Sequence, residues 1–315
     1  MIPEKGRFDR SVIPRIKEIV ELVHPDVLQT HNVKSHFLLK LSGLNRQRPW
    51  LAFQHGYTDT DFKMAVYNQL DRWSLRSACR VVTVCRAFTR YLLSYGVSSD
   101  RIRVLHNSVT APAASNLEDI AALRAKFGIA PSEKILLTVG RFSKEKGHAD
   151  LVEALAHLLR LRPDSDWKAL WVGSGPAQPA LEQLAESRGV AGRIVFAGFQ
   201  SAVTPFYAAS AIVVVPSHSE GSPNVVLEAM AARVPIASTT AGGVPEIVAD
   251  RETAMLSPVR DPRAIADSLA ALLADPSLCA RLSDAAAERA RLAFSPEAYR
   301  RNLIEIYTGA LAACP

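Results

Sequence analysis

A short apolar run, followed by a polar loop and a helix-forming segment, constrains the fold of this chain more than any other feature. Residues 211–216 read Ala-Ile-Val-Val-Val-Pro, which is typical of a strand buried on both faces because no position is polar. A polar loop follows, and then the strong helix formers Ala-Met-Ala-Ala at 229–232. Strands of this kind occur in parallel sheets covered by helices, so the run predicts an α/β fold.

The start of the helix after this strand predicts an anion site. We expect Ser222 to be the N-cap and Pro223 the first helical residue, where its missing N–H costs nothing. The free amides of Asn224 and Val225 would then point toward the carboxyl end of the strand. A helix N-terminus at that place attracts negative charge through its unpaired N–H groups and its dipole.

Two glutamates flank the predicted anion site. Glu220 lies in the loop before the helix, and Glu228 lies in its second turn, where side chains lean toward the N-terminus. Carboxylates beside a phosphate site are reasonable when they accept hydrogen bonds from hydroxyl groups. The pattern therefore indicates a ligand with a central diphosphate and sugar hydroxyls at both ends, a nucleotide sugar. The alternative for either glutamate alone is a solvated surface residue.

Length and composition leave room for two α/β domains. The chain has 315 residues and 48% of them are apolar, which is enough for large cores and argues against disorder. Its N-terminus lacks the apolar segment of a signal peptide, and no apolar run reaches the ~18 residues of a membrane span. The cysteines show no metal or redox spacing, so we expect reduced thiols in a cytoplasmic protein; they are Cys79, Cys85, Cys279 and Cys314.

Positive charge is concentrated in the first third of the chain. Residues 1–110 hold 17 Lys and Arg against 9 Asp and Glu, a net charge of +8. Residues 111–315 hold 20 against 22, a net charge of −2. This asymmetry suggests an anionic acceptor or peripheral contact with an acidic membrane surface, and a harmless solubilising charge is the alternative.

The first region alternates helices and strands, and polar residues collect where its strands end. Three predicted strands end in histidine, at His31, His55 and His106. Ligands bind at the carboxyl ends of strands in open α/β sheets, so each histidine is a candidate for substrate contact, with a structural role as the alternative. We expect helices over 9–23, from Ser35, over 63–77 and over 86–95, and strands over 26–30, 50–54, 80–84 and 101–105.

The alternation restarts after a linker over 110–115. Strands are expected over 135–139, 167–172, 193–197, 211–216 and 234–238, with a helix over 148–162. Beyond residue 261 the chain is expected to be helical, and a final helix over 295–312 has Ser295 as N-cap and Pro296 at the first position. Neither region has Gly-x-Gly-x-x-Gly after its first strand, which argues against a dinucleotide dehydrogenase.

Four motifs of the second region carry a family resemblance. They are Gly140-Arg141-x4-Lys146-Gly147, Gly173-x-Gly175-Pro176, Glu220-x7-Glu228 and Gly242-Gly243-x2-Glu246. In this order and at these separations they resemble the retaining GT-B glycosyltransferases of family 4 (glycosyl transferases group 1), which include bacterial cell-envelope sugar transferases. The resemblance covers about residues 115–295.

The resemblance implies an α/β GT-B architecture, with two Rossmann-like domains facing across a cleft. The expected domains are an acceptor-side domain over 1–110, a nucleotide-sugar-binding domain over 111–294, and a C-terminal helix over 295–315 that crosses back to the first domain. Family members normally begin with a strand, a glycine-rich loop and further strands that precede the equivalent of the helix over 9–23. Their absence here leads us to expect a shortened N-terminal half with an exposed apolar edge at the strand over 26–30. Such a half would belong to a longer protein, be covered by a partner, or be unstable.

The resemblance also implies roles for individual residues. Arg141 and Lys146 would hold the donor diphosphate, Glu220 the donor-sugar hydroxyls, and His55 would lie beside the donor sugar in the active site. Glu228 would hold the nucleotide ribose. The remaining donor-binding candidates are Gly175, Phe199, Gln200, Gly221, Ser222, Pro223, Asn224 and Val225, and the acceptor-side candidates are His31, Asn32 and Asn107.

Some residues depart from the family pattern or have no role in it. Arg233 and Ala254 stand where the family usually has glycine, so we expect two turns to differ slightly. The fold needs no Asp-x-Asp metal motif, and Asp59-Thr60-Asp61 is therefore interpreted as a solvated loop. No metal or cofactor is expected beyond the donor substrate itself.

The expected function is therefore retaining transfer of a sugar from a UDP- or GDP-sugar to a cell-envelope glycan, such as a lipopolysaccharide, or to a lipid-linked acceptor. In this family a departing phosphate oxygen is thought to take the acceptor's proton, so the protein positions the reactants and stabilises charge. Two alternatives stay open: a nucleotide-sugar-binding remnant without transferase activity, and a GT-B-fold epimerase or phosphorylase. We expect a cytoplasmic protein, peripheral at the inner membrane face, that does not bind nucleic acid.

Overall fold

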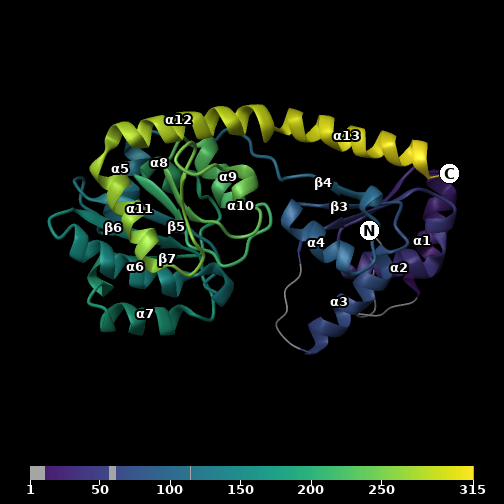
Figure 1. Cartoon of the computed structure of the whole chain (residues 1–315), viewed down its shortest axis with the longest axis horizontal. Helices are drawn as coiled ribbons and strands as arrows, with labels where there is room; N and C mark the ends of the chain where they lie inside the picture. The colour runs from purple at the N-terminus through teal and green to yellow at the C-terminus, as the bar shows by residue number, and fades with distance from the viewer. Residues whose placement is uncertain (1–10, 57–61, 114, 315) are drawn as a thin grey trace. The chain divides into compact units, whose positions relative to one another are not determined.

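The computed structural model describes residues 11–56, 62–113 and 115–314, and only the backbone of residues 62–66 (Figure 1). The chain divides into two compact units. Unit 1 comprises Met1–His106 and Tyr299–Pro315, and unit 2 comprises Asn107–Ala298. The predicted loop Asp59-Thr60-Asp61 and the beginning of the first predicted helix lie outside the described residues.

Unit 1 contains a parallel sheet in the order β1-β2-β3-β4. Its strands are β1 Leu28–Thr30, β2 Trp50–Gln54, β3 Arg80–Thr83 and β4 Ile102–Val104. Its helices are α1 Val12–Val23, α2 Val33–Ser42, α3 Phe62–Leu75 and α4 Arg86–Ser94, with short 3₁₀ turns at Leu44–Arg46 and Ser99–Arg101. Every predicted element of this region is present, and β1 lies at an edge of the sheet.

Helix α2 begins two residues earlier than expected. Asn32 is its N-cap, since the Asn32 side chain accepts a hydrogen bond from the Ser35 amide at 2.9 Å. The Ser35 hydroxyl in turn accepts from the Asn32 amide at 3.1 Å, which completes a capping box. The capping sequence Asn-x-x-Ser therefore makes Val33 the first helical residue. A prediction from the spacing of apolar residues alone places the helix start too late.

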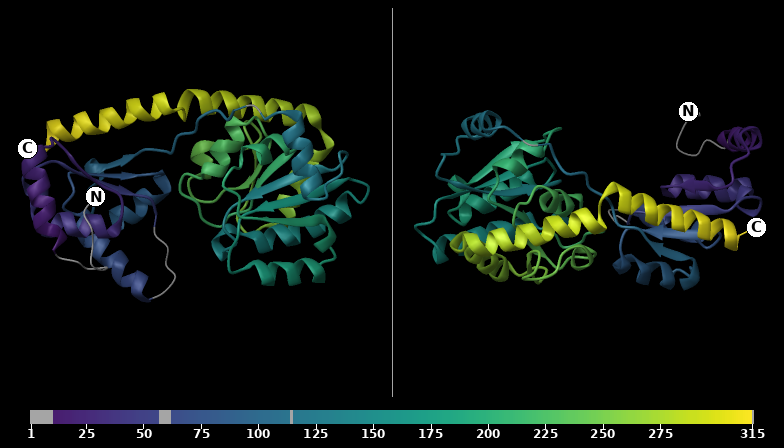
Figure 2. Two further views of the ribbon diagram at one scale, coloured as in Figure 1. Left: turned by 180° about the vertical axis from the view of Figure 1, so that it is seen from behind. Right: turned by 90° about the horizontal axis from the view of Figure 1, so that it is seen from above.

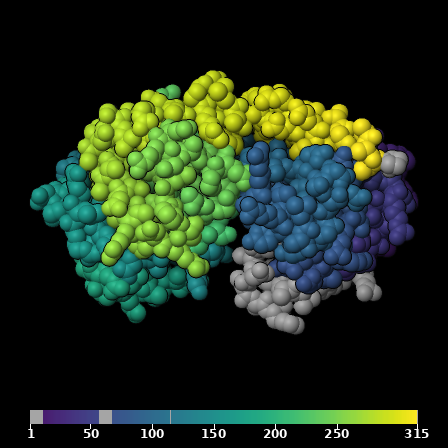
Figure 3. Space-filling view, in the orientation of Figure 1, coloured from purple at the N-terminus to yellow at the C-terminus, as the bar shows by residue number. Residues whose placement is uncertain are grey.

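The two faces of the first sheet are covered by different parts of the chain. Trp50, Ala52 and Val81 point to the side of α2, α3 and α4. Leu51, Phe53 and Val82 point to the other side, where they meet Ile306 and Ala310 of α13 Pro296–Ala313. Figure 3 shows this C-terminal segment, in yellow, against the blue part of unit 1. Because a parallel sheet must bury both faces, the last helix is part of the core of unit 1.

The last helix starts as the sequence predicts. The Ala298 amide donates a hydrogen bond to the Ser295 hydroxyl at 3.3 Å, so Ser295 is the N-cap and Pro296 the first helical residue.

The expectation of four reduced cysteines is wrong for one pair. Cys79, directly before β3, forms a disulfide with Cys314 at the end of α13, with their Cα atoms 6.2 Å apart. The two residues are 235 positions apart in the sequence, so no local spacing could indicate the bond. Packing of α13 on the sheet brings them together. Cys85 and Cys279 are not part of a disulfide.

Unit 2 contains a parallel sheet in the order β10-β9-β8-β5-β6-β7. Its strands are β5 Lys134–Val139, β6 Trp167–Val172, β7 Ile194–Gly198, β8 Ile212–Val215, β9 Ile236–Thr239 and β10 Met255–Ser257. Its helices are α5 Leu117–Lys126, α6 His148–Leu161, α7 Gln178–Ser187, α8 Thr204–Ala209, α9 Asn224–Ala231, α10 Val244–Ile247, α11 Pro262–Ala274 and α12 Pro276–Ala293. Short 3₁₀ turns lie at Lys144–Lys146 and Ala191–Arg193. All four residues of β8 are buried, as the apolar run predicts.

Alternate residues of each strand in unit 2 face opposite helical layers. Leu137 and Val213 belong to the core under α5, α8, α9 and α12, whereas Leu136 and Val214 belong to the core under α6, α7 and α11. The two layers are visible on either side of the sheet in Figures 1 and 2. This alternation explains why the strands are apolar at nearly every position.

Two further sequence expectations concern turns and membrane spans. Arg233, which stands where the family has glycine, adopts φ 56°, so a non-glycine residue occupies a left-handed turn there. Ala254 is not among the described residues with positive φ. In the part of the chain that the structure describes, each helix is too short or too polar to cross a bilayer.

Candidate functional site

The sheet of unit 2 has a switch point, where neighbouring strands are connected in opposite directions. β5 and β8 are adjacent, but the chain runs from β5 outward through β6 to β7, and from β8 outward through β9 to β10. In open α/β sheets ligands bind at the carboxyl ends of strands at such a switch point. The loops after β5 and β8 carry two of the four sequence motifs, so the topology places these motifs side by side.

An ion pair joins the two loops. The Lys146 Nζ lies 2.8 Å from Glu220 Oε1, and the Ser217 hydroxyl donates to the same oxygen at 2.6 Å. Glu220 is only 9% exposed, whereas the Lys146 side chain is 31% exposed. Lys146 is thus the cation that compensates a nearly buried carboxylate at the switch point, and the two motif residues form one unit.

Glycines let the loops approach each other backbone to backbone. Gly147 has φ 67°, and a Cβ atom there would stand 1.9 Å from the Pro216 carbonyl oxygen. Gly242, with φ 53°, lies equally close to the Glu220 carbonyl oxygen, and the Gly243 amide donates to that oxygen at 3.2 Å. The motif glycines therefore fix the loop that carries Glu220 from two sides, and any side chain at these positions would displace it.

Arg141 has a different partner from Lys146. Its guanidinium donates to Glu145 at 2.8 Å, and the Ser143 hydroxyl donates to the same carboxylate at 2.7 Å. Partial burial by itself would raise the pKa of Glu145, but the hydrogen bonds from Ser143 and Arg141 outweigh it and hold that pKa at about 2. The Arg141 side chain is 61% exposed, so it can turn toward a bound anion without losing a buried contact.

The helix start expected at Ser222 is wrong by one residue. Helix α9 begins at Asn224, and its N-cap is Pro223, with ψ 114° and no side-chain cap. The Ser222 hydroxyl instead accepts a hydrogen bond from the Asn107 amide at 3.0 Å. The Asn107 side-chain amide also donates to the Ser222 carbonyl and to Asn224 Oδ1, both at 2.9 Å. A residue 115 positions away thus takes the hydroxyl that local sequence assigns to the cap.

The anion site at this helix end keeps its donors. Among the described residues, no acceptor contacts the amides of Asn224 and Val225, and Val226 is the first to donate back to Pro223. The loop Gly221-Ser222-Pro223 connects the start of this helix to Glu220. Asn107, expected on the acceptor side, lies in unit 2 and braces this loop.

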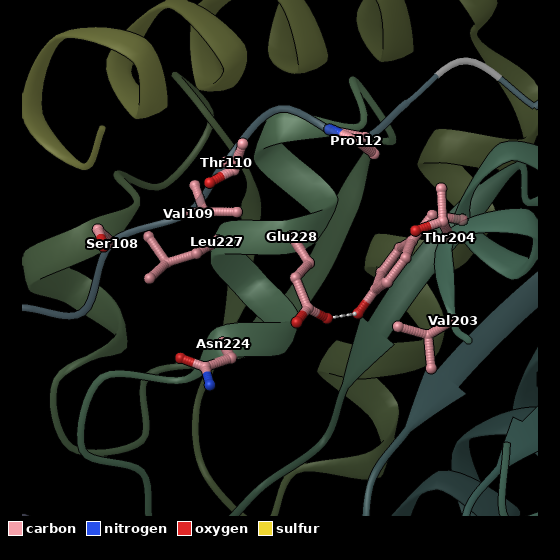
Figure 4. A pocket seen from close by; sticks show the side chains of 10 residues that line it. Ser108, Val109, Thr110, Pro112, Val203, Thr204, Asn224, Leu227 and Glu228 are labelled. Carbon is pink, nitrogen blue, oxygen red and sulfur yellow. Dashed lines mark hydrogen bonds between the residues drawn. The ribbon is translucent and has the colours of Figure 1, made fainter. Parts of the chain in front are cut away.

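Glu228 lines a cavity of about 280 Å³ between α8, α9 and the segment that follows Asn107 (Figure 4). The Tyr207 hydroxyl donates to Glu228 Oε2 at 2.6 Å. Burial, then the charge of Glu228 and this hydrogen bond, raise the pKa of Tyr207. The phenol therefore stays protonated and acts as a donor. The other lining residues are Ser108, Val109, Thr110, Pro112, Val203, Thr204, Asn224 and Leu227.

The other donor-binding candidates lie at the ends of β6 and β7. Gly175 follows β6, and a Cβ atom there would stand 2.3 Å from the Phe142 carbonyl oxygen. Phe199 and Gln200 follow β7. The Phe199 ring is 78% exposed, and the Gln200 side chain donates to the Ala197 carbonyl at 2.7 Å. An exposed aromatic ring at the carboxyl edge of the sheet is available for stacking.

Sequence reasoning missed several residues that hold this site. Ser217 and Tyr207 bond the two motif glutamates, and His218 Nε2 lies 2.7 Å from Asp150 of α6. The His218 amide also donates to the Glu145 carbonyl, which joins the loops after β8 and β5 again. Of these residues only Ser217 is near its partner in the sequence. Its position three residues before Glu220 was therefore the single sequence signal that could have indicated one of these contacts.

Two of the three histidines predicted at strand ends, His31 and His55, meet at the carboxyl ends of β1 and β2. His31 Nδ1 and His55 Nε2 lie 3.2 Å apart, and the two rings stack at 5.5 Å with an interplanar angle of 12°. Partial burial, followed by the neighbouring His31 and His36, lowers the pKa of His55. Burial and His36 lower the pKa of His31 as well. Both rings are therefore neutral near pH 7 and can accept a hydrogen bond.

Comparison with known proteins assigns the chain to a family. Residues 119–289 match the glycosyl transferases group 1, and residues 1–111 match glycosyltransferase family 4. N-acetyl-alpha-D-glucosaminyl L-malate synthase from Bacillus anthracis is 27% identical over 288 residues, which cover 89% of this chain and 74% of that protein. D-inositol 3-phosphate glycosyltransferase from Corynebacterium glutamicum is 34% identical over 227 residues, which cover 69% of this chain but 54% of that protein, about half its length.

The fold is shared with solved structures. The crystal structure of HepE from Anabaena in complex with UDP superposes with a TM-score of 0.82 at 21% identity, covering 94% of this chain and 82% of that chain. At this identity the likeness concerns the fold, and it confirms the GT-B architecture that the motifs predict. Since the match to glycosyl transferases group 1 spans more than half of the residues, the chain belongs to the family 4 GT-B glycosyltransferases, whose members retain the configuration of the transferred sugar.

Proposed function

We propose that the chain transfers a hexose or related sugar, with retention, from a UDP- or GDP-sugar to a cell-envelope glycan or a lipid-linked acceptor. The observation that carries this proposal is the Lys146–Glu220 ion pair at the switch point. Glu220 lies in the loop that leads to α9, whose first amides have no acceptor among the residues that the structure describes. A cation and free amides suit a diphosphate, and a nearly buried carboxylate suits sugar hydroxyls. HepE, which has the same fold, was crystallised with UDP, and this favours a uridine donor as the first to test.

Lys146 and Arg141 would act on the donor diphosphate. In the structure each cation is neutralised by a carboxylate, Glu220 or Glu145, at 2.8 Å. A bound diphosphate brings negative charge of its own, so both cations would turn part of their hydrogen bonding to its oxygens. They would then stabilise the charge that grows on the leaving phosphate as the bond to the sugar breaks.

Glu220 and His55 would position the sugar. The Glu220 carboxylate accepts hydrogen bonds from Lys146 and Ser217 through Oε1, and in the described part of the chain no donor contacts Oε2, so Oε2 can accept from a sugar hydroxyl. His55 is neutral near pH 7, so it can accept a hydrogen bond from a hydroxyl of the sugar or the acceptor. The basic balance of residues 1–110 supports an anionic acceptor or an acidic membrane surface near that acceptor.

The test is transfer from radiolabelled UDP- and GDP-sugars to envelope glycans and lipid-linked acceptors by wild type, Lys146→Met and Glu220→Gln. We expect each substitution to lower kcat/KM by about 100- to 1000-fold, as for removal of one preorganised charge or donor at a reacting centre. Each single variant also leaves a charge without its partner, so we expect a loss of about 1–3 kcal/mol of stability. The double variant should lose less than the sum of the single variants, because neither charge is then unpaired.

A second ion pair of unit 2 provides the matched control. Arg188, directly after α7, and Glu153 of α6 lie 2.7 Å apart on the surface, with side chains 45% and 31% exposed. Glu153→Gln and Arg188→Met remove a comparable contact and should leave turnover within twofold. Near-normal transfer by folded Lys146→Met or Glu220→Gln would refute the assigned roles. Donor binding without transfer to any acceptor would favour the binding remnant, and epimerised donor formed without acceptor would favour the epimerase.

A further inference from the structure

The contact between Tyr207 and Glu228 joins two elements that the chain connects only through β8. Tyr207 lies on α8 and Glu228 on α9, and the phenol oxygen is 2.6 Å from Glu228 Oε2. Tyr207 is 2% exposed, so its ring is fixed in the core between the sheet and these helices. A fixed phenol that donates to one carboxylate oxygen also fixes the orientation of the other oxygen.

The second oxygen of Glu228 is the one available to a ligand. Within the described residues no side chain or amide donates to Oε1, and the residue lines the cavity shown in Figure 4. The cavity holds about 280 Å³, near the roughly 300 Å³ at which small-ligand pockets begin. Hydroxyls of Ser108, Thr110 and Thr204 line the same space. The chemistry suits a ligand that has hydroxyl groups of its own.

The walls of this cavity are held by contacts that need no ligand. The Asn107 side chain donates to Asn224 Oδ1 at 2.9 Å, and the Val109 amide donates to the Phe294 carbonyl at 2.8 Å. Glu228 is the one carboxylate among the lining residues, and Tyr207 is its only hydrogen-bond donor in the described part of the chain. Orientation of that carboxylate therefore depends on a single phenol.

We propose that Tyr207 is a positioning residue for the donor: its hydroxyl holds Glu228 so that Oε1 accepts a ribose hydroxyl of the nucleoside diphosphate, and it thereby sets the preference for ribonucleotides over deoxynucleotides. This inference rests on the proposed function and on the ribose contact that the family resemblance implies for Glu228. Without the phenol the carboxylate is free to rotate, and the entropy lost on ordering it then opposes the hydrogen bond to the ribose. The effect belongs to donor binding rather than to the chemical step.

The test is calorimetric titration with UDP, GDP and ADP and with their 2′-deoxy and 3′-deoxy counterparts. Wild type should bind one ribonucleotide more tightly than at least one of its deoxy forms. Tyr207→Phe keeps the ring and removes only the hydroxyl, and we expect it to weaken ribonucleotide binding about 5- to 10-fold, the net contribution of one typical hydrogen bond. The affected deoxynucleotide should bind as it does to wild type. Donor KM should rise while kcat stays within twofold.

Controls separate a positioning role from a structural one. Tyr95→Phe in unit 1 removes a phenol that accepts from Arg72 at 2.9 Å, and it should leave nucleotide binding unchanged. If Tyr207→Phe fails to fold, Tyr207→Met serves instead, because it also lacks the hydroxyl, fills the same buried site and leaves Glu228 in place; it should show the same loss of discrimination. Thermal unfolding of each variant gives its stability independently.

The outcomes distinguish this inference from the proposed function. If Tyr207→Phe weakens ribonucleotides and deoxynucleotides equally, the contact is structural and the inference fails. If Glu228→Gln loses the discrimination but Tyr207→Phe keeps it, the inference also fails, while the ribose role of Glu228 stands. If wild type does not discriminate at all, or if Glu228→Gln discriminates like wild type, the ribose role of Glu228 is refuted and the inference falls with it.

Discussion

Substitution of Gly242 by alanine tests how the glycine loops hold the proposed active site. Gly242 has φ 53°, and a Cβ atom would stand 1.9 Å from the Glu220 carbonyl oxygen, on a backbone that the Gly243 amide also contacts. Real Cβ atoms essentially never come within 3.0 Å of such an atom, so the two loops must separate by at least 3.0 − 1.9 = 1.1 Å. The displaced residue is Glu220, the proposed ligand of the donor sugar.

The expected magnitude has a stability part and a functional part. A left-handed backbone costs a non-glycine residue roughly 1–2 kcal/mol, so Gly242→Ala should lose at least this much stability. A misplacement of about 1 Å in a catalytic site can cost about 100-fold in rate. We therefore expect kcat/KM to fall about 100-fold, which corresponds to about 2.7 kcal/mol of transition-state stabilisation.

Alanine substitutions at two other glycines of unit 2 distinguish the cost of a left-handed backbone from the cost of a steric clash with a neighbouring loop. Gly189 has φ 71°, and a Cβ atom there would meet nothing within 4 Å, so Gly189→Ala measures backbone strain alone. Gly192 has neither a positive φ nor a close neighbour, so Gly192→Ala should behave as wild type. Urea unfolding and sugar-transfer assays on the three variants decide the question. Equal turnover by Gly242→Ala and Gly189→Ala would show that the loop contact does not position Glu220.

Two further predictions concern stability. The Cys79–Cys314 disulfide links residues 235 positions apart, and its reduction should lower the free energy of unfolding, measured in urea, by up to about 5 kcal/mol. The control Cys314→Ser should not respond to reductant. An unchanged urea midpoint of the wild type after reduction would contradict this prediction. Burial, then the charge of Lys146, lowers the pKa of His148 from 6.5 to about 4, so the unfolded chain binds more protons between these values. The free energy of unfolding should therefore fall by about 3 kcal/mol as the pH drops from 6.5 to 4, because the pKa is lower by about 2.5 and each pKa unit corresponds to about 1.36 kcal/mol. His148→Phe should flatten this slope, and an equally steep slope in that variant would refute the assignment.

The order of elements and the identity of the motifs were accessible from the sequence. The apolar run that forms β8 is buried at all four positions, and the expected strands and helices occur in both units. These features depend on local periodicity, which the sequence records directly. The motif residues Lys146 and Glu220 were also predicted to share a site, because the family resemblance joins them across 74 positions.

The predictions from sequence were wrong or incomplete where the partner in a hydrogen bond or a disulfide lies far away in the sequence. The Ser222 hydroxyl looks like a helix cap, but Asn107 occupies it, and the helix starts one residue later. Tyr207 and Glu228 are 21 positions apart on different helices, so no spacing rule could pair them. The cysteines looked reduced for the same reason.

Local sequence therefore specifies the α/β class, the family motifs and the glycines that allow close loops, since each depends on residues near one another in the chain. Tertiary packing determines which partners those residues take. It gives Glu220 its lysine, Glu228 its tyrosine, and the last helix its place on the first sheet. The physical reason is that hydrogen-bond partners and buried faces are satisfied by whatever the packed chain brings within reach, at any separation in sequence.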